Sequence, residues 1–260
     1  GNYTKALLKF SDTQIIALDR DKTVIKTAKE ISKRFVERFT FYHTKFSKMD
    51  QFPINNFDAV IFDLGISSMQ LNDLSRGFSF KSKDKLDMSM GLSSVSIENI
   101  INTYQAKDLI NIIKTFGEEK EAKSIVNNII KQRKSSPIKT TDELVKIIKI
   151  SKRKNFKKKI DVSTKTFQAL RIIVNKEITE LIKGLIKATK ILKPGGKLIL
   201  ITFHSLEDKI VKYYFKNYSE NFSRQNKYRP ESANDKVSLF RTYKNKVIRA
   251  SQDELTINPR

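Results

Sequence analysis

The sequence of 260 residues contains no cysteine and no tryptophan, and its only histidines are His43 and His204. Without cysteine there are no disulfides, no thiol nucleophiles and no thiolate metal sites. Two histidines are too few for a multi-histidine metal centre, so no metal site is expected. The lack of cysteine also fits a reducing cytoplasm.

Long apolar runs are absent as well. No run approaches the roughly 18 residues that a membrane-spanning helix needs, so no membrane partner is expected. Hydrophobic residues nevertheless make up 39% of the chain. That fraction allows a large core, in one large domain or two small ones.

Negative charge is scarce relative to positive charge. The chain has 51 Lys and Arg against 28 Asp and Glu, a formal net charge of +23. Such an excess favours a polyanionic partner, because neutralising phosphates releases their counterions. The alternative explanation is a compositional bias toward lysine, asparagine and isoleucine.

The first 65 residues alternate between strand and helix patterns. Short apolar runs predict strands at 13–21, 39–46 and 57–65, and helical spacing of apolar residues covers 21–38. This alternation is typical of an α/β fold with a parallel sheet.

From about 93 to 151 only helical periodicity is present. Ser96 and Thr141 are plausible first residues of helices, although neither is followed by a clean capping box. The segment 149–159 then places seven basic residues among eleven. It is read either as a solvated tether or as an arm that faces RNA.

The α/β pattern resumes with one long helix predicted over 162–192, which stops at a Pro-Gly-Gly turn. A strand at 197–205 and a helix at 206–218 follow. The helical segment therefore interrupts an α/β domain.

The stretch "IFDLGISSMQLNDLSRGFSF" (61–80) turns an apolar strand into a long polar segment with two phenylalanines. Loops of this length are usually functional or disordered, and the aromatic residues argue against disorder. We expect it to contribute to a binding site.

Polar residues stand at three predicted strand ends, Asp19, Asp63 and His204. Ligands of doubly wound sheets bind beyond the carboxyl ends of the strands, where an acid accepts hydrogen bonds from an adenosine ribose. Asp19 suits this role for a nicotinamide dinucleotide and for S-adenosylmethionine equally. The alternative for Asp19 is a helix N-cap.

Three long segments resemble one family. They are "DLGISSMQLNDLSRGFSFKSKDKLDMSM" (63–90), "TFQALRIIVNKEITEL" (166–181) and "LKPGGKLILITFHSLEDKIVKYYF" (192–215). The chain is similar to the ribosomal RNA small subunit methyltransferase H group, also called MraW. That resemblance implies a class I S-adenosylmethionine-dependent methyltransferase fold (Rossmann-like) interrupted by a helical insertion domain. It also implies cytosine N4-methylation in 16S rRNA of the small subunit.

The same resemblance suggests domain boundaries and donor contacts. The methyltransferase domain would cover 1–90 and 162–260, and the insertion that recognises substrate would cover 91–161. The residues that match donor-binding positions of the family are Gly1, Asn2, Tyr3, Asp19, Phe46, Asp63 and Gln70. Asn2 departs from the family pattern, and Phe46 could instead be a core residue.

Substrate contacts are less specific. Arg76 and the basic residues Lys152, Arg153 and Lys154 are candidates for phosphate binding, and His204 for a further substrate contact. The alternative for His204 is capping by the following helix. Phe78 and Phe80 are read as packing residues rather than as residues that stack on bases.

Asp63 is the candidate catalytic residue, because an acceptor that holds the amino hydrogens of cytosine N4 would help that weak nucleophile to react. From the resemblance we expect roughly 30 further residues, including the first strand, before Gly1, and further family sequence after Arg260. We therefore expect weak donor binding and an unpaired sheet edge. The alternative function is that of a fragment that binds RNA without catalysis. The sequence does not decide the oligomeric state, and a homodimer is one possibility.

Overall fold

The computed structural model describes residues 1–52, 56–93, 95–152, 161–219, 238–242, 248 and 251–257. Contacts divide the chain into two compact units, 1–206 and 207–260, which are described separately below. None of the described helices is both long and apolar enough to cross a membrane. The predicted phosphate contacts Arg153 and Lys154 lie outside the described residues.

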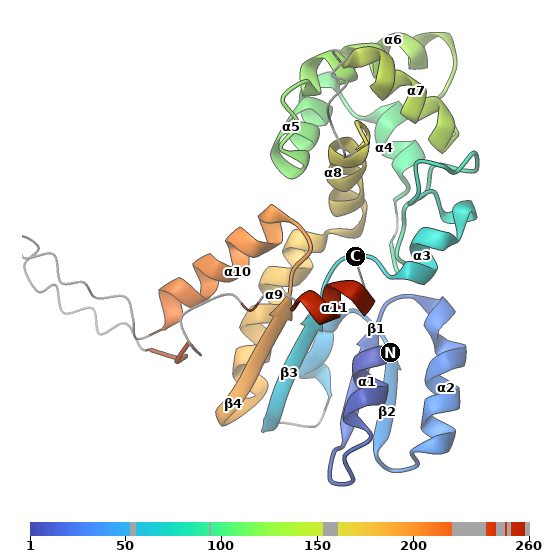
Figure 1. Ribbon diagram of the computed structural model, residues 1–260. Coiled ribbons are helices and arrows are strands. Elements are labelled where there is room, and N and C mark those ends of the chain that lie inside the picture. Colours follow the sequence, from blue (N-terminus) through green and yellow to red (C-terminus); the bar gives the residue numbers. More distant parts are fainter. Residues whose placement is uncertain are drawn as a thin grey trace, which may run out of the picture. The chain divides into compact units, whose positions relative to one another are not determined.

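Two pairs of parallel strands form the β structure of the first unit. Strand β1 (Ile15–Asp19) pairs with β2 (Phe39–His43), and β3 (Phe57–Asp63) pairs with β4 (Leu192–Ile201). Figure 1 shows the two pairs side by side. Among the described residues no ladder joins one pair to the other. The parallel α/β arrangement predicted from the sequence is confirmed.

Local sequence explains the helices that follow β1. Asp21 caps the short 3-10 helix η1 (Lys22–Val24) by accepting a hydrogen bond from the Thr23 amide. Helix α2 (Ile25–Arg34) continues the turn and buries Ala28 and Ile31 in a small core with Phe39 of β2. The N-terminal helix α1 (Asn2–Leu7) leads into Leu8, which is also part of that core.

The long helix predicted over 162–192 is two helices, α8 (Thr164–Asn175) and α9 (Glu177–Ile191). They meet at Lys176, which has a left-handed backbone with φ of 53°. No glycine or proline marks this break. Its cause is tertiary, because the Asn175 side chain is fully buried and bonded to a distant segment, as described below.

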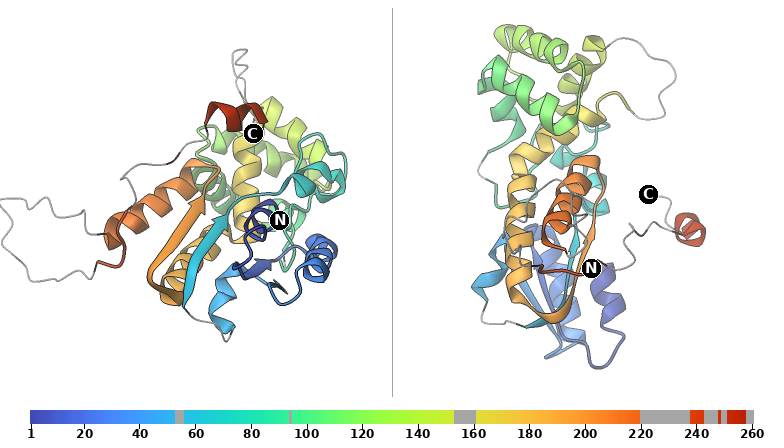
Figure 2. Two further views of the ribbon diagram at one scale, coloured as in Figure 1. Left: turned by 60° about the horizontal axis from the view of Figure 1, so that its bottom comes forward. Right: turned by 90° about the vertical axis from the view of Figure 1, so that its left-hand side faces the viewer.

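Helices α4 to α7 gather at one end of α8 (Figures 1 and 2). Their bounds are Ile97–Thr103, Ala106–Gly117, Ala122–Ser135 and Thr141–Ser151. Ser96 caps α4, as predicted. Helix α7 begins at Thr141, as predicted, but its N-cap is Thr140, in a complete capping box with Glu143, so the expectation of no clean box was wrong.

The core of this helical group extends beyond the predicted insertion 91–161. Phe78, Leu86 and Met88 enter it from the N-terminal side. Phe167, Leu170 and Val174 of α8 enter it from the C-terminal side. The helical group therefore buries its apolar faces partly against segments that the sequence assigns to the methyltransferase domain.

The second unit contains most of α10 (Ser205–Tyr218) and α11 (Gln252–Ile257). Aromatic residues of α10 pack with Phe240, whose ring centroid lies 5.4 Å from that of Phe215 and 6.2 Å from that of Tyr214. The backbone amides of Leu239 and Phe240 donate to the carbonyl of Tyr218. Aromatic contacts thus hold 238–240 to the end of this helix.

The contact between α5 and α8 depends on Gly117. A Cβ atom there would overlap the backbone oxygen of Lys165 and lie 3.3 Å from the Cβ of Ala169. We predict that Gly117→Ala separates the two helices and lowers the unfolding free energy by about 1–3 kcal/mol. Helix propensity alone predicts the opposite sign. Chemical denaturation measures the effect.

Thr115→Ala is the matched control, because Thr115 lies on the same helix with an exposed side chain. Its stability should stay within about 0.5 kcal/mol of the unchanged chain. A Gly117→Ala variant that is equally stable or more stable would contradict the close packing.

Candidate active site

Two carboxylates stand at the carboxyl ends of parallel strands. Asp19 is the last residue of β1 and Asp63 the last residue of β3. Burial raises the pKa of both side chains. The backbone nitrogen of Gly1 lies within electrostatic reach of both acids, which brings Gly1, Asp19 and Asp63 into one region.

The helix-capping alternative for Asp19 is not what the structure shows. Asp21, two residues later, is the N-cap of η1. Asp19 instead accepts a hydrogen bond of 2.8 Å from the Asp21 amide through Oδ1. The carboxylate at the end of β1 is thus oriented by the backbone and is not used by a helix terminus.

Other predicted donor contacts lie around these strand ends. Gly1 precedes α1, and Asn2 and Tyr3 form its exposed first turn. Phe46 begins the 3-10 helix η2 (Phe46–Gln51) and packs edge-on against Phe62, with ring centroids 5.2 Å apart. Its ring is partly buried, so it both packs in the interior and borders the region beyond β2.

A cavity of about 280 Å³ lies just beyond β2. It is lined by Thr44, Lys45, Lys48 and Leu92. Burial lowers the pKa of Lys45, and the Glu180 carboxylate, 3.8 Å from the ammonium, partly offsets this shift. The cavity adds a polar, partly enclosed space next to Phe46.

The polar segment after β3 is ordered by its own side chains. Helix α3 (Ser68–Asn72) starts with a complete capping box, in which Ser67 Oγ accepts from the Gln70 amide and Gln70 Oε1 accepts from the Ser67 amide. The Gln70 Nε2 donates to Asp21 Oδ2 at 2.6 Å. Gln70 was predicted to contact the methyl donor, but its side-chain oxygen and nitrogen both form hydrogen bonds within the protein.

Asp21 is the centre of this network, with only 2% of its surface exposed. Arg76, which ends the 3-10 helix η3 (Leu74–Arg76), donates from Nη1 to Asp21 Oδ2 at 2.5 Å and from Nη2 to the Ser89 carbonyl at 2.8 Å. Burial alone would raise the pKa of Asp21, but hydrogen bonds from Thr23, Arg76 and Gln70 lower it below its usual value. The Arg76 guanidinium, a predicted phosphate contact, is thus held in a buried ion pair.

The two phenylalanines of the segment are packing residues, as expected. Phe78 is 4% exposed, and the Arg76 guanidinium lies 5.4 Å from its ring centroid. Phe80 meets Phe167 of α8 edge-on at 5.5 Å. They anchor the segment to the helical core.

Arg20 connects the end of β1 to a later part of this segment. Its guanidinium donates to the Gly91 carbonyl at 3.0 Å, to Ser93 Oγ at 3.0 Å and to the Asn175 carbonyl at 2.8 Å. Gly91 has φ of +87°, and a Cβ atom there would lie 2.5 Å from the Arg20 carbonyl. The residue that follows Asp19 thus holds 91–93 at close range.

Asn175 completes this clamp from the end of α8. Its side chain is fully buried, accepts from the Met90 amide at 2.8 Å and donates to the Met88 carbonyl at 2.9 Å. These bonds hold both sides of Ser89. Segment 88–93 is therefore fixed from β1 and from α8 together.

The remaining predicted substrate residues are dispersed. Lys152 at the end of α7 lies 2.5 Å from the Glu119 carboxylate and donates to the Val162 carbonyl, and its side chain is only 10% exposed. His204 is partly buried in the turn that follows β4. The structure thus gives Lys152 an internal partner and brings His204 to the carboxyl end of β4.

Sequence reasoning missed Asp21, Arg20 and Asn175. Asp21 carried one usable signal, because an Asp two residues before Thr23 is a common cap. Arg20 bonds to residues that lie 71 to 155 positions away in the chain. The bonds from Asn175 to Met88 and Met90 also join distant parts of the chain. No local pattern could have shown such contacts.

The residues at the strand ends suit a sulfonium nucleoside. A carboxylate accepts hydrogen bonds from ribose hydroxyls, an aromatic ring borders an adenine, and a second acid adds negative charge near a cationic group. Asp19, Phe46 and Asp63 supply these three groups.

Comparison with known proteins gives one consistent result. The MraW methylase family matches residues 1–260. A protein of Rickettsia akari named ribosomal RNA small subunit methyltransferase H is 40% identical over 263 residues, covering 100% of this chain and 85% of the relative. Proteins of the same name from Sinorhizobium fredii (40%; 100% and 76% covered) and Ehrlichia canis (39%; 100% and 86% covered) are similarly related.

The Asp21–Arg76 pair predicts a pH-dependent stability. Arg76→Ala leaves a buried carboxylate without its charged partner, which costs about 3–5 kcal/mol. The pKa of Asp21 is lowered by folding, so this stabilisation is present above its usual pKa of 3.8 and lost as pH falls through the folded-state pKa. Urea unfolding from neutral to acidic pH should show the largest deficit at neutral pH.

Lys146→Ala is the control, because its pair with Asp142 is exposed on α7 and surface pairs contribute about 0–1 kcal/mol. If Arg76→Ala and Lys146→Ala cost the same at neutral pH, the Asp21 network is not a stabilising centre.

Proposed function

This chain belongs to the MraW methylase family, and from that premise we propose that it methylates N4 of a cytosine in 16S ribosomal RNA of the small subunit. The fold is that of class I methyltransferases, and the methyl donor of this kind of enzyme is S-adenosylmethionine. The related proteins are named for an activity on small-subunit ribosomal RNA. Their match over the whole chain favours an enzyme over a fragment that only binds RNA.

The observation that carries the proposal is the pair of carboxylates around Gly1. Asp19 at the end of β1 would accept hydrogen bonds from the donor ribose, with Phe46 beside the adenine. Gly1, Asn2 and Tyr3 would contact the donor through the backbone of the first turn. Gln70 acts through Asp21, by fixing the segment that closes over the site.

When bound, the donor supplies a methyl group that is attached to a positively charged sulfur. The rest of the donor leaves as a neutral thioether. The substrate amine would receive that methyl group through the N4 lone pair and would then release one proton to solvent. Asp63 would hold an amino hydrogen of N4, which orients the lone pair and stabilises the charge that develops on nitrogen. Because little other chemistry is needed, positioning does most of the work.

The RNA partner is supported by charge. Exposed lysines lie on α5 to α7 and on the loops that join them, and they are Lys107, Lys114, Lys120, Lys123, Lys131, Lys134, Lys139, Lys146 and Lys149. Lysines on such a surface neutralise phosphates and make binding weaken with salt. The target base must leave its stack to reach the strand ends, which suits a non-helical RNA segment. The proposal includes the assembled small subunit as the substrate and a homodimer as the form of the enzyme.

Asp19→Asn tests the donor site. The amide retains the shape of the side chain but loses the charge and one acceptor position, so donor affinity should fall about tenfold or more, the effect of weakening one charge-assisted hydrogen bond. Isothermal titration with S-adenosylmethionine measures this change. The control is Asp12→Asn, an exposed acid before β1. Unchanged donor affinity in Asp19→Asn would exclude the ribose role.

Asp63→Asn tests the catalytic role at saturating donor. We expect a loss of turnover of at least about a hundredfold, since an acceptor aimed at developing charge contributes on that scale. Because burial raises the pKa of Asp63, wild-type turnover should fall with decreasing pH at a higher pH than for a free aspartate, and Asp63→Asn should lack this limb. Methyl incorporation into small subunits across pH is the measurement. Wild-type turnover in the variant would end the assignment.

A further inference from the structure

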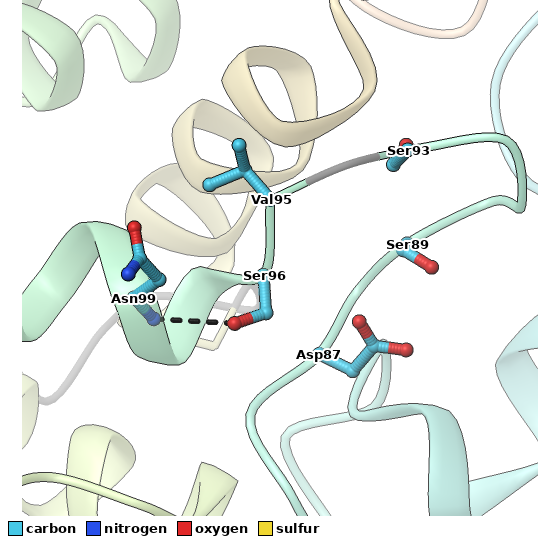
Figure 3. A pocket seen from close by; sticks show the side chains of 6 residues that line it. All are labelled: Asp87, Ser89, Ser93, Val95, Ser96 and Asn99. Carbon is cyan, nitrogen blue, oxygen red and sulfur yellow. Dashed lines mark hydrogen bonds between the residues drawn. The ribbon is translucent and has the colours of Figure 1, made fainter.

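Residues within 87–93 and 95–99 line a second cavity, of about 460 Å³. Figure 3 shows its lining, which consists of Asp87, Ser89, Ser93, Val95, Ser96 and Asn99. This volume lies within the roughly 300–1,000 Å³ of typical small-molecule sites. Five of the six lining side chains are polar, so the cavity is suited to a ligand rich in hydrogen-bonding groups.

Several of these polar groups have no partner among the residues that the structure describes. Across the described parts of the chain, no hydrogen bond or ion pair involves the Asp87 carboxylate, the Ser89 hydroxyl or the Asn99 side-chain amide. Figure 3 shows the carboxylate directed into the space between Ser89 and Ser96. Ser96, in contrast, is engaged as the cap of α4. The cavity thus offers one charged acceptor and two neutral groups that both donate and accept.

The walls of the cavity are held by the clamp described above. Arg20 donates to Ser93 Oγ, and Asn175 bonds the backbone on both sides of Ser89. Arg76 donates to the Ser89 carbonyl at 2.8 Å. Since Arg20 directly follows Asp19, the cavity wall is tied to the residue next to the proposed donor-ribose acid.

The chemistry of the lining selects among ligands. A carboxylate that forms no ion pair with the described residues repels phosphate and attracts N–H and O–H donors. A ribonucleoside presents such donors, in its ribose hydroxyls and in the amino groups of its base. The 2′-hydroxyl is also the group that lets a protein distinguish RNA from DNA at one site.

We propose that this cavity binds one ribonucleoside of the substrate strand beside the methylated cytosine, and that Asp87 accepts a hydrogen bond from its 2′-hydroxyl. Ser89 and Asn99 contact the base. This inference rests on the proposed function, because it takes the ligand to be part of the RNA substrate. Asp87 is then a specificity-determining residue that takes no part in the methyl transfer itself.

Two measurements on the full chain test the proposal. Saturation-transfer NMR with cytidine and 2′-deoxycytidine should show binding of the ribonucleoside and about tenfold weaker binding of the deoxynucleoside, the effect of losing a hydrogen bond to a charged group. Asp87→Asn should remove most of this preference. In the methylation of small subunits, the same variant should raise KM for subunits about tenfold while kcat and donor affinity stay unchanged.

Asp84→Asn is the matched control, because Asp84 is an exposed acid three residues before Asp87 and does not line the cavity. Ser89→Ala is the second variant, and it should weaken cytidine binding without changing the preference for ribose. The inference is overturned if Asp87→Asn keeps both the ribose preference and the wild-type KM. If the unchanged chain binds ribonucleosides as expected but methylates no subunits, the proposed function fails and the cavity assignment stands on binding alone.

Discussion

A carboxylate that has been removed from water is stable only when other groups replace the lost hydration, and Asp21 satisfies this condition through partners from three parts of the chain. Thr23 lies beside it, Gln70 comes from α3 and Arg76 from η3. These bonds connect the turn after β1 to the polar segment after β3. The positions of the donor acids and of the second cavity both depend on that connection.

Much of the fold follows from local pattern. The apolar runs that predict β1, β2 and β3 are strands, and the spacing of apolar residues between 93 and 151 yields four helices. These predictions succeed because the period of side-chain burial is a property of the backbone itself. The polar residues at strand ends, such as Asp19 and Asp63, were predictable for the same reason, since chain order in a parallel sheet brings those ends together.

The features that sequence reasoning did not reach are set by long-range contacts. The single helix predicted over 162–192 is interrupted at Lys176 without any local signal, because Asn175 is bonded to Met88 and Met90. Arg76 resembled a phosphate-binding residue, but a buried acid 55 positions earlier takes its guanidinium. Asp87 could not be recognised from the sequence either. What distinguishes its carboxylate is that it has no hydrogen-bond or ion-pair partner among the described residues, and only the structure shows this.

The junction at Lys176 has a mechanical consequence. Helix α9 packs against η2 and β4, whereas α8 packs against α5, so the two helices join the strands to the lysine-rich bundle. The twelve residues of α8 rise about 18 Å, and a tilt of about 10° at its base would shift the far end by about 3 Å. The buried side-chain amide of Asn175 therefore determines how far the helical bundle lies from the strands. The angle at Lys176 then determines how a long polyanion can contact the bundle and the strand ends together.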